Sequence, residues 1–272
     1  MREVREGTVE GLGFSCANRV AVLVVRGQTW VSPMKVFGFL FLFLAILAGG
    51  VSAQQAESRA ELIVISGGPA LRAWEEYRVP ADQHDRYAGN FIKAAHIRMQ
   101  GMRRTQPQAQ LTWAIYRPAY TSRDREDAVR QPPYQCNMAE IQTRAATVDA
   151  KIFWFSTTPQ LMNYLNNRKG RPIAHLEYFG HSNKYAFLFD YSSDILGVST
   201  CYLHASDLKG LRGGIFTRNA HIQSWGCHTA EYMSQIFKRR TGHPMIGAVG
   251  KTDYSAIADN VSLPAVNGRW GQ

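Results

Sequence analysis

Two short stretches of the sequence place a reactive side chain directly after an apolar run. In "IQSWGCHTA" (residues 222–230) the run ends at a glycine and Cys227, and in "HLEYFGHS" (residues 175–182) it ends at a glycine and His181. A thiol becomes a good nucleophile once it loses its proton, and an imidazole is a suitable base near neutral pH. The two stretches therefore predict a nucleophile and a general base, provided that the fold brings them together.

The chemistry expected of this pair is acyl transfer. Cys227 would attack a carbonyl carbon, and His181 would take the thiol proton and return it to the leaving group. We expect the backbone N–H groups of Ser182 and Cys227 to hold the oxyanion. A helix predicted over residues 229–237 would favour the thiolate through its positive end, with Thr229 as its cap. The alternative is structural: a buried cysteine packs as a small apolar side chain.

The rest of the sequence predicts the elements that must position these residues. Apolar and β-branched runs predict strands at residues 61–69, 111–118, 172–182, 185–192, 219–225 and 243–255. Helical spacing predicts helices at residues 82–104, 158–170, 204–211 and 229–237, while 138–155 begins as a helix with an ambiguous end. Residues 119–135 are predicted to be a polar loop.

Alternation of strands and helices is typical of an α/β fold, in which a mostly parallel sheet is covered by helices on both faces. Ligands of such folds bind beyond the carboxyl ends of the strands. Cys227 and His181 both follow predicted strands, so we expect both at this edge of the sheet.

At these residues the chain resembles the caspase-like cysteine peptidases, the clan that includes gingipains, legumains, separases and CHAT domains. Members have one apolar strand that ends in His-Gly and another that ends in a small residue and cysteine. The segment "GCHTA" is close to the "ACxTA" of CHAT-like members. The resemblance is specific over residues 172–255 and only topological over 61–170.

The resemblance implies a caspase-like three-layer α/β/α sandwich with a mostly parallel sheet. It further implies a cysteine endopeptidase that uses a dyad of His181 and Cys227, forms an acyl-enzyme and requires no cofactor. Two departures keep an alternative open, because Ser182 replaces the glycine that usually follows the histidine, and the chain ends soon after the strand predicted at 243–255. The alternative is a catalytically inactive caspase-like domain that binds a peptide or protein partner.

Other polar residues near the two stretches have two interpretations each. Asp253 lies where related enzymes shape the substrate pocket, so it either selects a basic side chain or caps a turn. Glu177 shares a strand face with His181 and either orients it or forms a structural ion pair. No paired Cys or His spacing typical of metal sites is present, so no metal site is predicted.

Residues 34–53 are interpreted as a secretory signal peptide. Lys35 precedes an apolar run at residues 36–48, and Ala53 ends a stretch of small residues that suits cleavage. The product would be secreted or periplasmic, without a stable membrane span after cleavage; an uncleaved anchor is the alternative. Residues 1–33 fit poorly before such a signal and are interpreted as a misassigned N-terminal extension. The predicted domain therefore occupies residues 54–272.

The net charge and the cysteine content limit which substrates and which disulfide bonds we expect. The 272-residue chain has a formal net charge of +10, and residues 1–53 hold five Lys/Arg and three Asp/Glu, which leaves +8 for the domain. The basic residues are scattered and no nucleic-acid-binding signature accompanies them, so we expect a peptide or protein substrate. A basic protein that only binds anionic surfaces is a further possibility. Cys136 and Cys201 could form a disulfide in an oxidising compartment, which leaves Cys227 as a thiol.

Overall fold

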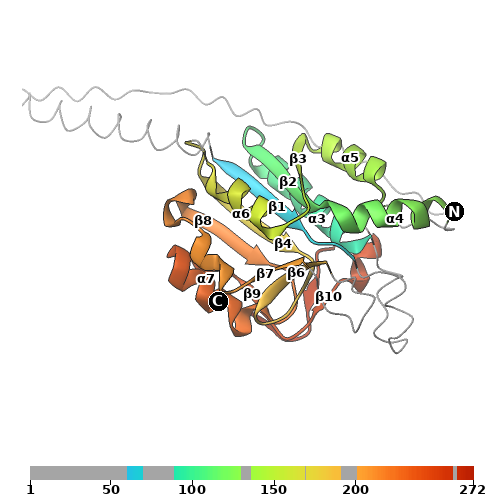
Figure 1. Ribbon diagram of the computed structural model, residues 1–272. Coiled ribbons are helices and arrows are strands. Elements are labelled where there is room, and N and C mark those ends of the chain that lie inside the picture. Colours follow the sequence, from blue (N-terminus) through green and yellow to red (C-terminus); the bar gives the residue numbers. More distant parts are fainter. Residues whose placement is uncertain (1–59, 70–88, 130–135, 169, 191–200, 260–261) are drawn as a thin grey trace, which may run out of the picture. The chain divides into compact units, whose positions relative to one another are not determined.

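The computed structural model describes residues 60–69, 89–129, 136–168, 170–190, 201–259 and 262–272 (Figure 1). The predicted extension (1–33) and signal peptide (34–53) lie outside the described residues, as do parts of the elements predicted at 82–104 and 185–192. In the described part of the chain, no helix is long and apolar enough to cross a membrane.

The described residues form a central sheet of five parallel strands. In chain order they are β1 (Glu61–Ser66), β2 (Gln110–Tyr116), β3 (Ala150–Phe155), β4 (Ile173–Phe179) and β8 (Phe216–Ser224). Their order in the sheet is β3-β2-β1-β4-β8, so the chain first winds outward from β1 and then returns to place β4 on its other side. Ligands of such sheets bind beyond the carboxyl ends, near the point where the strand order reverses.

Helices cover both faces of the sheet (Figure 1). They are α3 (Asn90–Thr105), α4 (Arg117–Val129), α5 (Met138–Thr147), α6 (Thr158–Asn166) and α7 (Met233–Thr241). Leu62 of β1 belongs to an apolar cluster with Met99 of α3, whereas the next residue, Ile63, belongs to a second cluster with Leu161 of α6 and Phe237 of α7. Neighbouring strand residues thus face opposite layers. This arrangement confirms the predicted three-layer α/β/α sandwich with a mostly parallel sheet.

Smaller elements complete the described part of the fold, and some of them follow the carboxyl ends of β4 and β8 directly. Antiparallel strands β5 (His181–Ser182), β6 (Ala186–Asp190) and β7 (Cys201–His204) form a second sheet. Two further pairs join β9 (Gly247–Val249) to β12 (Arg269–Gly271) and β10 (Thr252–Asp253) to β11 (Ala265–Val266). Short 3₁₀ helices are η3 (Asp207–Gly210), η4 (Gly213–Ile215), η5 (Thr229–Glu231) and η6 (Ser255–Asp259).

Several predicted boundaries were wrong. The polar loop predicted at residues 119–135 is helical as far as Val129, because Pro118 lies in the first turn of α4, where its missing N–H leaves no hydrogen bond unmade. The ambiguous pattern at residues 138–155 divides into α5 and β3 around Asp149, which adopts a left-handed φ of 49°. The strand predicted at residues 243–255 is interrupted at Gly250, whose φ is 92°.

Cys136 and Cys201 do not form a disulfide with each other. Cys136 is buried in the apolar cluster beneath α3 and α5, whereas Cys201 packs against the cluster beneath α6 and α7. The sheet therefore separates the two thiols, which excludes the pairing that the sequence left open.

His96 on α3 gives the fold a specific pH dependence. It is buried, and its Nε2 lies 2.9 Å from the Thr147 hydroxyl oxygen. Burial, followed by the charge of Arg144, lowers the pKa of His96 from 6.5 to about 4. Between pH 6.5 and about 4, the unfolded chain therefore binds a proton at His96 that the folded chain does not bind. The free energy of unfolding consequently falls as the pH decreases toward 4.

We expect His96→Gln, which can still bond to Thr147, to reduce this loss of stability. Urea unfolding of the wild type and variant at about pH 7 and about pH 4.5 measures the effect. The wild type should lose more free energy of unfolding than the variant between the two values. An equal loss in both proteins would contradict the assignment.

Candidate active site

The structure brings the two predicted strand-end corners together. Strands β4 and β8 are parallel neighbours with Tyr178 opposite Ser224, and the N–H of Trp225 donates to the Tyr178 carbonyl at 2.8 Å. Just beyond, the Ser182 hydroxyl donates to the Cys227 carbonyl at 2.7 Å. The chain around His181 and the chain around Cys227 therefore lie side by side at the carboxyl edge of the sheet.

Gly226 is required for this close approach. A Cβ atom at residue 226 would lie 2.8 Å from the Ser182 Cβ and 3.2 Å from the Gly180 carbonyl oxygen, and it would collide with the Ser182 hydroxyl. Only a residue without a side chain lets the two corners meet at this distance.

Gly226→Ala is therefore expected to separate the corners and to destabilise the protein by about 1–3 kcal/mol, as overpacking does. Gly213→Ala is the matched control, because a Cβ atom there would meet nothing within 4 Å. Thermal unfolding should show a lower Tm for the first variant and little change for the second. Equal Tm values for the two variants would show that the contact at Gly226 is not tight.

Two tyrosines, the partly buried Tyr254 and the buried Tyr178, each bond to the backbone of one corner. The Tyr254 hydroxyl donates to the Trp225 carbonyl at 2.9 Å. The Tyr178 hydroxyl donates to the His181 carbonyl at 2.6 Å. Burial raises the pKa of both tyrosines well above 10, so both remain donors at all physiological pH values.

The thiol of Cys227 is partly exposed and contacts β10. Its Sγ accepts a hydrogen bond from the N–H of Thr252 at 3.3 Å and lies 3.3 Å from the Thr252 hydroxyl oxygen. No hydrogen bond to another described residue takes up the N–H of Cys227 itself, which leaves this donor available to an oxyanion.

The ring of His181 lies on the side of the sheet covered by α3. It packs edge-on against Phe91, with ring centroids 4.9 Å apart, and Phe91 packs in the same way against Tyr254. The structure thus joins the two corners through their backbones, while the thiol contacts Thr252 and the imidazole contacts Phe91. Proton transfer between thiol and imidazole, and the oxyanion role of the Ser182 N–H, remain predictions.

The segment after Cys227 differs from the predicted helix at residues 229–237. His228 adopts a left-handed φ of 61°, the 3₁₀ helix η5 follows, and α7 begins only at Met233. The Thr229 hydroxyl donates to the Gly226 carbonyl instead of capping a helix. The predicted helix dipole therefore does not start beside the thiol, and the N–H of Thr252 is the donor found there.

His228 and Glu231 close this turn. The His228 Nδ1 lies 2.6 Å from the Glu231 carboxylate, and the same carboxylate accepts a hydrogen bond from the Gly250 N–H. These two contacts, the His228 bond first, lower the pKa of Glu231. His228 therefore belongs to the turn that supports Cys227.

The structure gives the other predicted residues mainly structural contacts. The Asp253 carboxylate accepts a hydrogen bond from the Ser255 N–H at 2.7 Å, as expected of a turn-capping aspartate. Glu177 is fully buried and forms an ion pair with Arg98 of α3. Selection of a basic substrate side chain by Asp253 remains a prediction.

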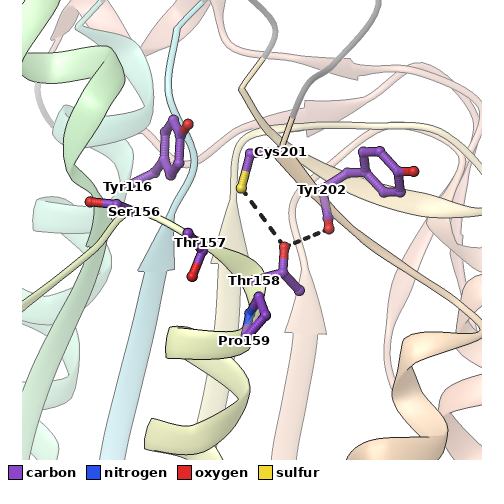
Figure 2. Close-up of a pocket in the computed structure, with 7 residues that line it drawn as sticks. All are labelled: Tyr116, Ser156, Thr157, Thr158, Pro159, Cys201 and Tyr202. Atoms are coloured by element: carbon purple, nitrogen blue, oxygen red, sulfur yellow. Dashed lines mark hydrogen bonds between the residues drawn. The ribbon is translucent and has the colours of Figure 1, made fainter.

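A cavity of 380 Å³ lies near the carboxyl ends of β2 and β3 (Figure 2). Its lining consists of Tyr116, Ser156, Thr157, Thr158, Pro159, Cys201 and Tyr202. The Thr158 hydroxyl donates to the Tyr202 carbonyl at 2.6 Å and lies 3.8 Å from the Cys201 sulfur. Burial raises the pKa of the Cys201 thiol, which makes it a suitable reference for the reactivity of Cys227.

No group of three or more His, Cys, Asp or Glu side chains in the described part of the chain is arranged to hold a metal ion. Comparisons with protein-family models, with curated proteins and with solved structures found no match. The resemblance to caspase-like peptidases therefore rests on the residues around His181 and Cys227.

Proposed function

We propose that this protein is an exported, caspase-like cysteine endopeptidase with Cys227 as nucleophile and His181 as general base. The observation that supports it best is the meeting of the two strand-end corners, where Gly226 packs against Gly180 and Ser182. A nucleophile and a base on neighbouring strand ends share the edge at which α/β folds bind ligands. Export depends on the signal peptide predicted at residues 34–53.

The reaction proceeds in two steps. His181 takes the proton of the Cys227 thiol, and the sulfur attacks the peptide carbonyl carbon while the N–H groups of Cys227 and Ser182 hold the oxyanion. His181 then gives the proton to the leaving amine, which departs and leaves a thioester. In the second step water gives a proton to His181 and attacks the thioester carbonyl carbon. The carbon–sulfur bond breaks, the carboxylic acid product leaves, and the sulfur takes the proton back from His181.

Exposed aromatic side chains near the corners favour a peptide or protein ligand. Tyr185 lies four residues after His181, and Tyr232 lies five residues after Cys227. Their rings pack edge-to-face with centroids 5.0 Å apart, although both side chains are exposed. Exposed Trp270 packs against Trp225, the residue before Gly226. Tyrosine and tryptophan are enriched at protein-binding surfaces, because they offer a large apolar area with a polar group.

The proposed function is tested by incubating the purified full chain with a complex peptide mixture and identifying new termini by mass spectrometry. Cys227→Ala and His181→Ala are the matched variants. We expect new termini with the wild type and none with Cys227→Ala. Cleavage by the wild type and Cys227→Ala alike would rule out this nucleophile.

A second candidate is an inactive caspase-like domain that binds a peptide. Two observations favour it: Ser182 stands where the family usually has glycine, and the Cys227 sulfur contacts Thr252. This candidate predicts that peptides from the same mixture are retained by the wild type and by Cys227→Ala, with cleavage by neither.

A further inference from the structure

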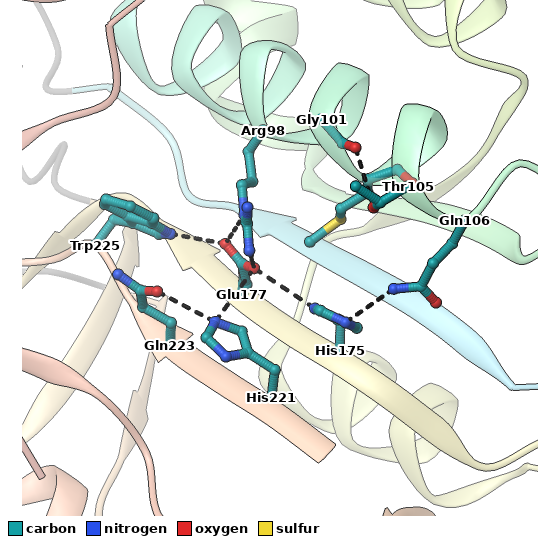
Figure 3. Close-up of polar contacts among 10 residues, drawn as sticks. Arg98, Gly101, Thr105, Gln106, His175, Glu177, His221, Gln223 and Trp225 are labelled. Atoms are coloured by element: carbon teal, nitrogen blue, oxygen red, sulfur yellow. Dashed lines mark hydrogen bonds and ion pairs between the residues drawn. The ribbon is translucent and has the colours of Figure 1, made fainter. Parts of the chain in front are cut away.

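We propose that Glu177 is a positioning residue for Cys227, acting through the indole of Trp225. The proposal deepens the proposed function and rests on it. It starts from a buried carboxylate two residues before the end of β4, on the strand that leads to the His181 corner (Figure 3).

Glu177 is held firmly. The Arg98 Nε lies 2.9 Å from both carboxylate oxygens, and its Nη2 lies 2.7 Å from Oε1. The guanidinium, which extends from α3, therefore donates hydrogen bonds to both oxygens of Glu177. A fork of this kind fixes the direction of a carboxylate as well as its place. His175 and His221, at 3.9 Å and 3.7 Å from Oε1, lie at the rim of the same group.

The carboxylate also accepts a hydrogen bond from the residue that follows the neighbouring strand, β8. The Trp225 Nε1–H donates to the Glu177 Oε2 at 2.9 Å. Burial by itself would raise the pKa of Glu177, but hydrogen bonds and the charge of Arg98 outweigh it and lower the pKa to about 2. The carboxylate therefore stays ionised, and its bond to the indole is charge-assisted at all working pH values.

Trp225 is the last residue before the Gly226–Cys227 turn. Its N–H donates to the Tyr178 carbonyl, its carbonyl accepts from Tyr254, and its ring stacks on Phe179 with centroids 5.5 Å apart. The hydrogen bond to Glu177 restricts the rotation of the Trp225 ring, which the other contacts leave possible. Loss of this bond leaves a buried indole N–H unsatisfied, so the ring and the backbone that enters the turn shift together.

The matched pair of variants is Trp225→Phe and Trp113→Phe. Each removes one buried indole donor with a 2.9 Å bond, to Glu177 in the first case and to Ser66 in the second. Both changes should cost stability, but only Trp225 borders the turn. A readout of Cys227 beyond stability therefore separates positioning from general support.

We expect Trp225→Phe to lower kcat for a cleaved peptide by roughly 10- to 100-fold, because small misplacements of reacting groups have effects of this size. KM should change little. The rate at which iodoacetamide alkylates Cys227 should fall together with kcat. Trp113→Phe should leave kcat and the alkylation rate at wild-type values despite a lower Tm. Equal kcat losses in both variants, or an unchanged kcat in Trp225→Phe, would overturn the proposal.

A second pair keeps the test informative if one variant fails to fold. Glu177→Gln retains an oxygen that can accept the indole N–H, whereas Glu177→Leu does not, so only the first should retain most of the Cys227 alkylation rate. Equal alkylation rates in the two variants would contradict the proposal. Absence of peptide cleavage by the wild type, with alkylation still dependent on Trp225, would contradict the proposed function alone.

Discussion

Replacing Cys227 with serine is expected to lower kcat for peptide hydrolysis by on the order of 10⁴-fold or more, the loss seen when a catalytic nucleophile is removed. A hydroxyl holds its proton far more tightly than a thiol, so His181 removes the proton of serine far less readily. The serine oxygen can still accept from the Thr252 N–H, so the Tm should change little. Initial-rate assays and thermal unfolding of the same preparations measure both effects.

Cys201→Ser is the control for this substitution. Cys201 lines the separate cavity beside Thr158, and burial raises the pKa of its thiol. We expect full activity in Cys201→Ser. Retention of more than about one hundredth of the activity by Cys227→Ser, or a comparable loss in Cys201→Ser, would contradict the assignment of the nucleophile.

Arg98→Met is expected to destabilise the fold by about 3 kcal/mol, because breaking a buried ion pair leaves an uncompensated charge. The Glu177 side chain is fully buried, but that of Arg98 is 27% exposed. The loss of stability should therefore lie at the lower end of the range expected when a buried ion pair is broken. For a domain of this size the Tm should fall by roughly 6–12 °C. Urea unfolding at about pH 7 gives the free energy directly.

The pH dependence and a double variant identify the cause. Glu177 has a pKa of about 2 in the fold against 4.5 as the ordinary value, so its stabilising contribution is complete above 4.5 and is lost as the pH falls toward 2. In Arg98→Met, protonation of Glu177 relieves the unpaired charge, so the deficit relative to the wild type should shrink at about pH 3. Arg98→Met combined with Glu177→Gln should be more stable than Arg98→Met alone. A deficit that is independent of pH and unrelieved in the double variant would show that lost packing, not charge, is responsible.

Local patterns were sufficient to predict the α/β sandwich and the two corners. Runs such as "ELIVIS" in β1 and "IAHLEYF" in β4 are mostly apolar and do not alternate with exposed polar residues, because helices cover both faces of the sheet. The placement of Cys227 and His181 at strand ends followed from the same runs. The prediction that both corners share one edge depends only on the strands being parallel.

The errors arise where distant residues decide the local conformation. The helix predicted at residues 229–237 is interrupted because the His228 N–H bonds to the Gly250 carbonyl, a partner that periodicity does not reveal. In the same way, the start of β3 was ambiguous because "AKIFWF" follows α5 almost directly, and its partner β2 is about 40 residues away in the sequence. Thr252 and Tyr254, which contact the Cys227 and Trp225 corner, carry no local signal of that role.

The most direct test of the account is to map where a panel of peptide acyloxymethyl ketones, electrophiles that react with activated cysteine nucleophiles, becomes attached. The full chain, His181→Ala and Cys227→Ser would be treated in parallel, and the modified residue identified by mass spectrometry. We expect one adduct on Cys227 of the wild type, formed far more slowly in His181→Ala and not at all in Cys227→Ser. Adducts on Cys201 or Cys136, or an adduct on Cys227 that forms at the same rate without His181, would contradict it.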